Sequence, residues 1–165
     1  MKEVDTYLIS KEIQIDYGHR VPNHKSKCRN FHGHRGRIKV WFQGQIITKK
    51  GDSSEGMLMD FSDIKTILME EIDARLDHGF IMSKNDPLLK SFEKLCKEPK
   101  LKLIIVDFIP TAENLAKYCF DLIRPRIFKT YNDSLVLKKV EFYETPSSIA
   151  IYEPVWQGRQ EWIKP

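Results

Sequence analysis

One short stretch constrains the chain most. Two histidines separated by a single glycine, His32-Gly33-His34, open a run in which apolar and polar residues alternate. The apolar members of this run share the parity of the histidines: Ile38, Val40 and Phe42. A period of two predicts a β-strand over about residues 34–47, with both imidazoles on one face, about 7 Å apart. Two imidazoles at this spacing can reach one metal ion, so the strand is predicted to carry chemistry.

The preceding segment, residues 8–19, shows the same alternation and ends in another histidine, His19. Its predicted inward row is Ile13, Ile15, Tyr17 and His19. A single inward histidine is more often a hydrogen-bonded core residue than a metal ligand. Beside a strand with two histidines of matching alternation, however, His19 is predicted to complete a tripod with an open fourth position, as in catalytic zinc sites.

Cys28 lies in the loop between the two strands, separated from His32 by three residues. Free cysteines usually pack as small hydrophobic residues. This one is flanked by Lys25, Lys27 and Arg29 and lies near a predicted dication, and such surroundings favour the thiolate. We therefore predict a functional thiol. Whether it binds the metal or moves protons is left open by the sequence.

A first amphipathic helix is expected after Asp60, with Gly79 ending it, because apolar residues recur at helical spacing. Its predicted buried stripe is Ile64, Ile67, Leu68, Ile72 and Leu76. Asp77 and His78 stand just past this stripe. His78 is explained equally well as a cation at a helix C-terminus or as part of an Asp–His dyad for proton transfer, and both explanations stay open.

The second half of the chain predicts another long helix and a closing hairpin. Thr111 is the expected N-cap of the helix. Strands are expected at about residues 135–143 and 148–152, with Glu144 between them. Glu144 is either a solvated turn residue or a carboxylate that accepts paired N–H groups, such as those of a 2-aminopyrimidinone ring. Residues 81–109, between the helices, predict a short helix and a short buried strand.

Composition excludes several classes of protein. A chain of 165 residues with 41% hydrophobic and 30% charged residues fits one soluble domain. Its apolar runs are too short for a transmembrane helix, and its polar start does not resemble a signal peptide. Three cysteines without a C-x-x-C pair fit a reducing cytoplasm. The net charge of +4 comes from dispersed basic residues, which favours an anionic small substrate over nucleic acid.

Six motifs occur in an order that resembles the 6-pyruvoyltetrahydropterin synthase and 6-carboxytetrahydropterin synthase family. They are His19, Cys28-x-x-x-His32-Gly33-His34, Gly56-Met57-x-Met59-Asp60-Phe61, Leu76-Asp77-His78, Pro110-Thr111-x-Glu113-Asn114 and Glu144-Thr145. The resemblance covers about residues 8–153. It implies one such domain over residues 1–165, with an insertion at about 81–109 and a C-terminal tail at 154–165.

The fold that the resemblance implies is the tunnelling fold (T-fold), an α+β fold. An antiparallel four-stranded sheet carries two helices on one face in that family. Three subunits join their sheets into a β-barrel, and two such rings stack as a hexamer. The chain is therefore expected to be a cytoplasmic homo-oligomer, either a trimer or a hexamer, with no nucleic-acid or membrane partner.

The resemblance also implies a set of site residues and a reaction. The matching residues are the Zn²⁺ ligands His19, His32 and His34, the catalytic thiol Cys28, the proton-transfer dyad Asp77 and His78, and the pterin-binding residues Glu144 and Thr145. The implied enzyme is a zinc-dependent lyase. It converts 7,8-dihydroneopterin triphosphate to 6-carboxy-5,6,7,8-tetrahydropterin, acetaldehyde and triphosphate, on the route to queuosine and related 7-deazapurines.

Two other functions remain open. The three-residue gap between Cys28 and His32 is typical of family members that make the carboxy product, whereas those that make 6-pyruvoyltetrahydropterin often have a longer gap. A non-catalytic zinc- or pterin-binding module would instead have a closed metal site, with Cys28 as the fourth ligand. One departure from the family pattern is Gly36, where a large side chain is usual. Its absence is expected to open the pocket or loosen the second strand.

Overall fold

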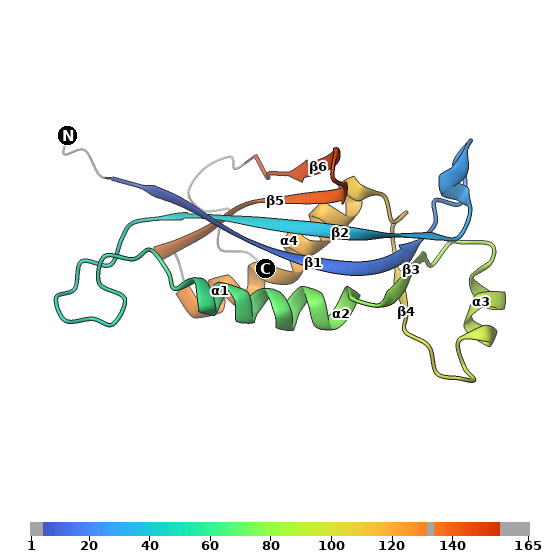
Figure 1. Ribbon diagram of the computed structural model, residues 1–165, viewed down its shortest axis with the longest axis horizontal. Helices are drawn as coiled ribbons and strands as arrows, with labels where there is room; N and C mark the ends of the chain where they lie inside the picture. The colour runs from blue at the N-terminus through green and yellow to red at the C-terminus, as the bar shows by residue number, and fades with distance from the viewer. Residues whose placement is uncertain (1–4, 132–133, 156–165) are drawn as a thin grey trace.

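Two long antiparallel strands, β1 (Tyr7–His19) and β2 (His32–Gly44), run along most of the molecule (Figure 1). They pair in one continuous register that places His19 opposite His32. Their alternation explains the pairing, because this register gives both strands the same apolar face. The end of β1 and the start of β2 therefore lie side by side, at the edge of the molecule where the histidines are.

The remaining elements complete the sheet and cover it with helices. They are η1 (Lys27–Arg29), α1 (Phe61–Leu68), η2 (Met69–Asp73), α2 (Ala74–Leu76), β3 (Gly79–Ser83), α3 (Leu89–Leu95), β4 (Leu103–Val106), α4 (Ala112–Tyr131), β5 (Leu135–Thr145) and β6 (Ser148–Tyr152). The structure, a computed structural model, describes residues 5–131 and 134–155. Most of the expected tail at 154–165 lies outside these residues. Within them, every helix is too short or too polar to cross a bilayer.

The α+β class is confirmed, but the sheet has more strands than the four expected. Its order is β4-β3-β1-β2-β5-β6. The antiparallel part is β1, β2, β5 and β6, and the additional strands β3 and β4 are parallel to their neighbours. β3 pairs with residues 17–19 of β1, where unpaired backbone groups would otherwise form an open edge. The segment expected to be an insertion thus extends the sheet beside His19.

The core lies between one face of the sheet and the helices. The stripe predicted for the first helix is fully or almost fully buried: Ile64, Ile67, Leu68, Ile72 and Leu76. Asp60 is the N-cap of α1, because its Oδ1 accepts the amide of Ser62 at 2.7 Å. The sheet contributes Ile13, Ile15, Ile38, Val40 and Phe42 to the same cluster. Burial of each such side chain contributes about 1.5–3 kcal/mol, so this layer anchors the strands that carry the histidines.

The chain leaves α2 differently from the sequence expectation. Gly79 was expected to supply the left-handed turn, but His78 has the positive φ, 55°, and Gly79 starts β3. Gly79 is needed for another reason, since a Cβ there would lie 2.3 Å from Cδ1 of Ile104. The amide of His78 donates to the carbonyl oxygen of Asp16 at 2.7 Å, which holds this conformation. A left-handed residue other than glycine costs about 1–3 kcal/mol and is often functional.

Candidate active site

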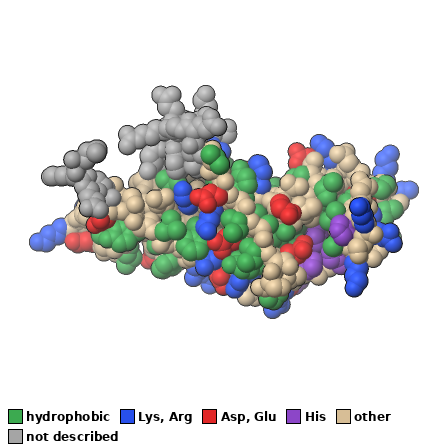
Figure 2. All heavy atoms as spheres, turned by 90° about the horizontal axis from the view of Figure 1, so that it is seen from above, with side chains coloured by type: hydrophobic (Ala, Val, Ile, Leu, Met, Phe, Trp, Pro, Cys, Tyr) green, Lys and Arg blue, Asp and Glu red, His purple; other side chains and the backbone are tan. Residues whose placement is uncertain are grey.

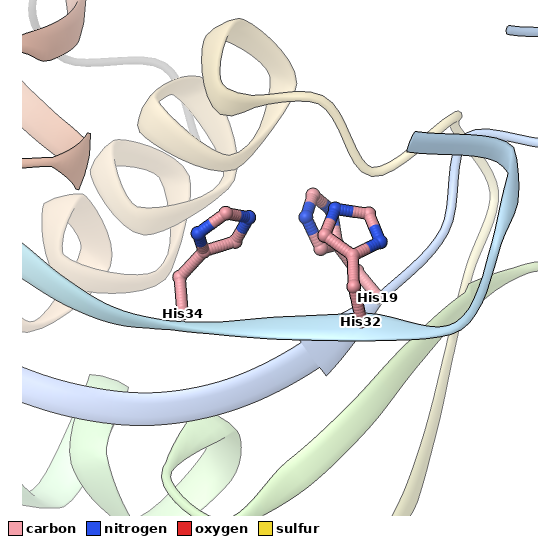
Figure 3. A group of neighbouring side chains, drawn as sticks. All are labelled: His19, His32 and His34. Atoms are coloured by element: carbon pink, nitrogen blue, oxygen red, sulfur yellow. The ribbon is translucent and has the colours of Figure 1, made fainter. Parts of the chain in front are cut away.

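Three histidines converge at one end of the sheet (Figure 3). His19 is the last residue of β1, and His32 and His34 are the first and third residues of β2. One ligand nitrogen from each ring lies within 4.8 Å of the others. Among the described residues, this is the group of histidine, cysteine or acidic side chains placed to share a metal ion. The alternation of the strands therefore produces the tripod geometry expected from it.

Hydrogen bonds define the tautomer of two of these rings. Nδ1 of His19 lies 2.7 Å from the carbonyl oxygen of Pro110, and Nδ1 of His32 lies 2.8 Å from that of Asn30. A carbonyl oxygen only accepts, so each Nδ1 carries the proton and each Nε2 keeps its lone pair. The Nε2 atoms of His19 and His34 are buried and lack a hydrogen-bond partner. A metal ion would satisfy these atoms.

The charge state of the tripod also suits a metal. Burial lowers the pKa of His19 to about 4, against a smaller opposing effect of the Pro110 carbonyl. Burial lowers the pKa of His34 as well, although the carboxylate of Glu144 opposes this. Both rings are therefore neutral near pH 7, which is the form that binds metal ions. Among the described residues, three imidazoles converge without a fourth protein ligand, and this donor set fits catalytic zinc.

Cys28 and Glu144 share a pocket of about 260 Å³ with His19. Cys28 is half-buried in the η1 turn. Glu144 continues the inward row of β5, so its Oε1 reaches to 3.6 Å from Nε2 of His19 and 4.0 Å from Nε2 of His34. Cys28 is not part of the converging ligand group. The structure thus brings the thiol and the carboxylate to the tripod, and the thiol lies outside the metal-ligand set.

The surface around this end of the molecule is largely basic. In Figure 2, histidine side chains gather at one end, with lysine and arginine side chains around them. Lys25, Lys27 and Arg29 are all exposed on the loop that carries Cys28. Such a rim attracts an anionic ligand.

Asp77 and His78 form the expected hydrogen-bonded pair. Nδ1 of His78 lies 2.6 Å from Oδ2 of Asp77, and Oδ1 of Asp77 accepts the amide of Asp16 at 2.8 Å. Partial burial would raise the pKa of Asp77, but the hydrogen bonds from Asp16 and His78 outweigh this and lower it. The carboxylate is therefore ionised near neutral pH and orients the imidazole.

The dyad nevertheless faces a pocket other than the one that Cys28 and Glu144 line. His78 lines a second pocket of about 570 Å³ together with Asp16 and Arg35, and Tyr17 and His34 line this pocket as well. Asp16 and Arg35 have the parity opposite to that of the tripod, so their side chains point to the other face of the sheet. The side chain of His78 is 76% exposed. Within one chain, His78 is therefore not in the pocket of Cys28 and Glu144.

Thr145 is also outside the tripod pocket. It pairs with Ser148 at the turn between β5 and β6. Thr145 does not line the pocket that Glu144 shares with Cys28 and His19. Of the two residues expected to bind the pterin ring, the structure brings Glu144 to the tripod and leaves Thr145 at the adjoining turn.

Comparison with known proteins identifies the family to which the chain belongs. The family model described as 6-pyruvoyl tetrahydropterin synthase matches residues 8–155 of the chain. The chain belongs to this family. The α+β sheet with its helical cover is accordingly the T-fold of the family.

Two curated relatives in the family carry the name 6-carboxy-5,6,7,8-tetrahydropterin synthase. The protein of Haemophilus influenzae is 29% identical over 147 residues, covering 89% of this chain and 99% of its own length. The protein of Rickettsia conorii is 31% identical over 138 residues, covering 84% of this chain and 94% of its own length. Nearly the whole of each relative is thus represented here.

Solved structures of the family agree with this fold. An uncharacterized protein of Wolinella succinogenes has a TM-score of 0.73 and 26% identity, over 90% of this chain and 98% of that one. The 6-pyruvoyl tetrahydropterin synthase of Caenorhabditis elegans has a TM-score of 0.64 and 23% identity, over 94% of this chain and 100% of that one. The second likeness shows the shared fold alone.

Gly36, the departure from the family pattern, is compensated by Tyr17. A Cβ on Gly36 would lie 2.9 Å from Cε1 of Tyr17, so the tyrosine ring occupies the space of a side chain at position 36. The Tyr17 ring is buried, with its centroid 5.2 Å from that of His19 and 5.9 Å from that of His34. The strand β2 also continues through Gly36. β2 is therefore not interrupted at Gly36, and the ring of Tyr17 from the paired strand fills the adjoining space.

The sequence interpretation missed roles for the start of α4. The carbonyl of Pro110 orients His19, and Thr111 and Glu113 line the tripod pocket. The expected N-cap role of Thr111 agrees with its Oγ1, which accepts the amide of Asn114 at 3.5 Å. The family motif that contains these residues could have indicated that they belong to the active site. An N-cap role for Thr111 and a first-turn position for Glu113, however, explain both residues as parts of a helix alone.

Proposed function

We propose that the chain is a zinc-dependent lyase that converts 7,8-dihydroneopterin triphosphate to 6-carboxy-5,6,7,8-tetrahydropterin, with release of acetaldehyde and triphosphate. The observation that carries this proposal is the histidine tripod, one member of which shares a pocket with a thiol outside the ligand group and with a carboxylate. The names of the curated relatives support the carboxy product. The product would feed synthesis of queuosine or another 7-deazapurine.

His19, His32 and His34 would hold the zinc ion through their free Nε2 atoms. Bound zinc supplies a Lewis acid that polarises a substrate oxygen and lowers the pKa of a hydroxyl group. Three protein ligands leave a further position for the side chain of the substrate. Pro110 and Asn30 keep two of the rings in the required tautomer before zinc arrives.

Recognition of the pterin ring is assigned to Glu144, with Thr145 beside it. A carboxylate accepts two parallel N–H groups, and the 2-amino group and adjacent ring N–H of a pterin offer such a pair. Glu144 is close enough to His19 that a ring held by this carboxylate would extend its side chain toward the tripod. The basic rim around Cys28 would attract the triphosphate.

Cys28 and the Asp77–His78 dyad are the proposed proton carriers. Loss of triphosphate leaves two adjacent carbonyl groups on the side chain, after protons have moved from its carbons toward the ring. Addition of water and cleavage between the two carbonyl carbons then leaves a carboxyl group on the ring and releases acetaldehyde. The thiolate of Cys28 takes a side-chain proton, and the imidazole of His78, oriented by Asp77, takes or returns one.

The separation of His78 from Cys28 suggests that subunits share the site. One chain presents these two residues in different pockets, so His78 would act at the Cys28 pocket of a neighbouring copy. The sheet also ends in the exposed strand β6, where Ile149 is 49% and Ile151 58% exposed. Joining sheets edge to edge would cover such an edge. We assign a trimer or hexamer on this basis.

The proposed unit is a single domain over the whole chain, with residues 81–109 as an insertion. All three cysteines are free thiols. Free thiols fit the reducing cytoplasm, where the small pterin substrate would also be found. No nucleic-acid or membrane partner forms part of the proposal.

A zinc- or pterin-binding module without turnover is the competing function. A structural zinc site is normally closed by four protein ligands, which here would require Cys28 on the metal. Cys28 lies outside the converging group, whereas it lines the pocket beside Glu144. This arrangement favours a substrate site over a closed structural one.

Product analysis tests the proposal. Zinc-loaded protein is incubated with 7,8-dihydroneopterin triphosphate while acetaldehyde is trapped as a hydrazone and the pterin is followed by mass spectrometry. The expected result is 6-carboxytetrahydropterin, acetaldehyde and triphosphate in equal amounts. Triphosphate with 6-pyruvoyltetrahydropterin and no aldehyde would identify the pyruvoyl reaction instead. Tight substrate binding without product would identify a binding module.

A further inference from the structure

A buried arginine beside the tripod has no part in the chemistry described so far. Arg20 follows His19 directly and is 8% exposed. Its Nε donates to the carbonyl oxygen of Arg29 at 2.9 Å, and its Nη1 donates to Oδ1 of Asp86 at 2.8 Å. A buried guanidinium is costly unless it is paired, so these two contacts define its position. Arg20 therefore links the turn that carries Cys28 to the segment that follows the dyad.

The Asp86 end of this link is firmly held. The Asp86 side chain is fully buried, and its Oδ1 also accepts the amide of Leu88 at 2.8 Å. The Asp86 amide donates to the carbonyl oxygen of Ser83 at 2.9 Å, and its own carbonyl accepts the amide of Leu89 at 3.0 Å. Asp86 thus joins the end of β3 to the start of α3. A carboxylate fixed at both its side chain and its backbone is a rigid anchor.

The Cys28 end is a compact, hydrogen-bonded turn. The amide of Val21 donates to the carbonyl oxygen of Cys28 at 2.8 Å, which closes the loop at its base. The amide of Asn30 donates to the carbonyl oxygen of Lys27 at 3.0 Å. Arg29 directly follows Cys28, and its carbonyl oxygen accepts the hydrogen bond from Arg20. The position of the sulfur is therefore coupled to the position of the guanidinium.

An aromatic cluster connects the same two segments independently. Phe31, just after the turn, has its ring centroid 5.4 Å from that of Phe80 and 5.3 Å from that of Phe92 on α3. The rings of Phe80 and Phe92 lie 4.9 Å apart. The guanidinium of Arg20 lies 5.5 Å from the Phe31 centroid. A Cβ on Gly18 would lie 2.4 Å from the Phe80 ring, so glycine there allows the cluster to pack against β1.

We propose, building on the function proposed above, that Arg20 and Asp86 are positioning residues that hold Cys28 at its working distance from the substrate. The inserted segment then supports the catalytic turn through Asp86 and Phe92. Neither Arg20 nor Asp86 touches the reacting atoms. A displacement of about 1 Å can lower a rate about a hundredfold, so a rigid support for the thiol matters for catalysis.

Alkylation of Cys28 tests the proposal without substrate. Zinc-loaded protein is treated with iodoacetamide at fixed pH, and modification of Cys28 is followed by peptide mass spectrometry, which separates it from the buried Cys96 and Cys119. Arg20→Met should make alkylation about tenfold faster, because a loosened turn exposes the half-buried sulfur more often. Its zinc content should stay at one ion per chain. Its kcat should fall about tenfold to a hundredfold with little change in KM.

Conservative variants keep the test decisive if Arg20→Met does not fold. Arg20→Lys retains a cation for Asp86 but cannot hold two acceptors in the fork geometry of arginine, so faster alkylation and lower kcat are expected with normal thermal stability. Asp86→Asn keeps the acceptor for Leu88 but loses the charge, so a smaller change in the same direction is expected. The control is Arg126→Met, which removes an exposed partner of Glu70 and should change neither readout.

Two results would overturn the positioning role. Wild-type alkylation rates in both Arg20→Lys and Asp86→Asn would show that the turn does not depend on the pair. Loss of zinc in proportion to loss of rate would make Arg20 a support of the metal ligands instead. The alkylation result stands even if the wild-type protein shows no turnover, so failure of the proposed function is distinguished from failure of this inference.

Discussion

The two halves of the proposed site differ in how completely one chain builds them. In the tripod, His19 is 1% exposed, its Nδ1 is held by the carbonyl of Pro110, and its pKa is lowered to about 4. In the dyad, His78 has a side chain that is 76% exposed and is oriented by Asp77. The first half is buried at His19, partly buried at His32 and His34, and organised before any ligand arrives. The second half is presented at the surface.

This difference indicates which of the two steps, metal binding or proton transfer, depends on the assembly of subunits. Metal binding draws on two paired strands of the same chain, so it should not depend on neighbouring subunits. Proton transfer by His78 is proposed to take place at the Cys28 pocket of a neighbouring subunit. The left-handed backbone of His78, held by the carbonyl of Asp16, is a local strain that folding maintains at this proposed proton carrier. Substitutions in the two halves should therefore separate metal binding from turnover.

The largest effect is expected from His32→Ala. Two imidazoles remain, so the protein should lose its zinc on dialysis against a weak chelator, and turnover should be abolished. The measurement is zinc per chain by atomic absorption, with product formation followed in parallel. His78→Ala is the matched control, because it should keep one zinc per chain while losing activity. Full zinc occupancy in His32→Ala would refute the tripod.

Cys28→Ala should keep its zinc and lose activity by at least about a hundredfold, the scale of a missing proton-transfer group. This result would place the thiol with the chemistry and not with the ligands. Cys119→Ala is the control, because Cys119 is buried in the core on α4, away from the pocket. Zinc loss in parallel with activity in Cys28→Ala would instead make the sulfur a metal ligand.

A smaller effect, on stability, is expected from substitution of Gly36, because the ring of Tyr17 fills the space beside it. Gly36→Ala places a Cβ 2.9 Å from the tyrosine ring and should destabilise the protein by about 1–3 kcal/mol, as overpacking does. Chemical denaturation of the zinc-free protein measures this. In a Tyr17→Ala background the same substitution should cost nothing. An equal cost in both backgrounds would show that the ring does not substitute for the missing side chain.

The sequence predicted the parts of the molecule that follow local periodicity. β1 and β2 alternate cleanly, so their shared face and the tripod of His19, His32 and His34 could be predicted together. The buried stripe of the first helix follows from its 3.6-residue period in the same way.

The parts it did not predict depend on contacts between distant segments. The parallel pairing of β3 and β4 depends on which sheet edge is left open, and short apolar runs do not specify this. The Arg20–Asp86 pair joins residues 66 apart, without any local pattern. The positive φ of His78 is held by a hydrogen bond to Asp16, a residue of another strand, so the local sequence does not specify it. The division of the site into two halves therefore depends on contacts between distant segments, which local sequence patterns do not specify.

Mixing two inactive variants tests this division most directly. Cys28→Ala and His78→Ala chains, carrying different tags, are co-expressed, and hybrid oligomers are purified through both tags and sized by light scattering. If each site takes Cys28 from one subunit and His78 from its neighbour, the purified hybrids should recover about a third of wild-type activity as trimers and about a quarter as hexamers, since these are the shares of sites that combine both intact groups. Hybrids of trimeric or hexameric size that remain as inactive as the parent variants would contradict the account.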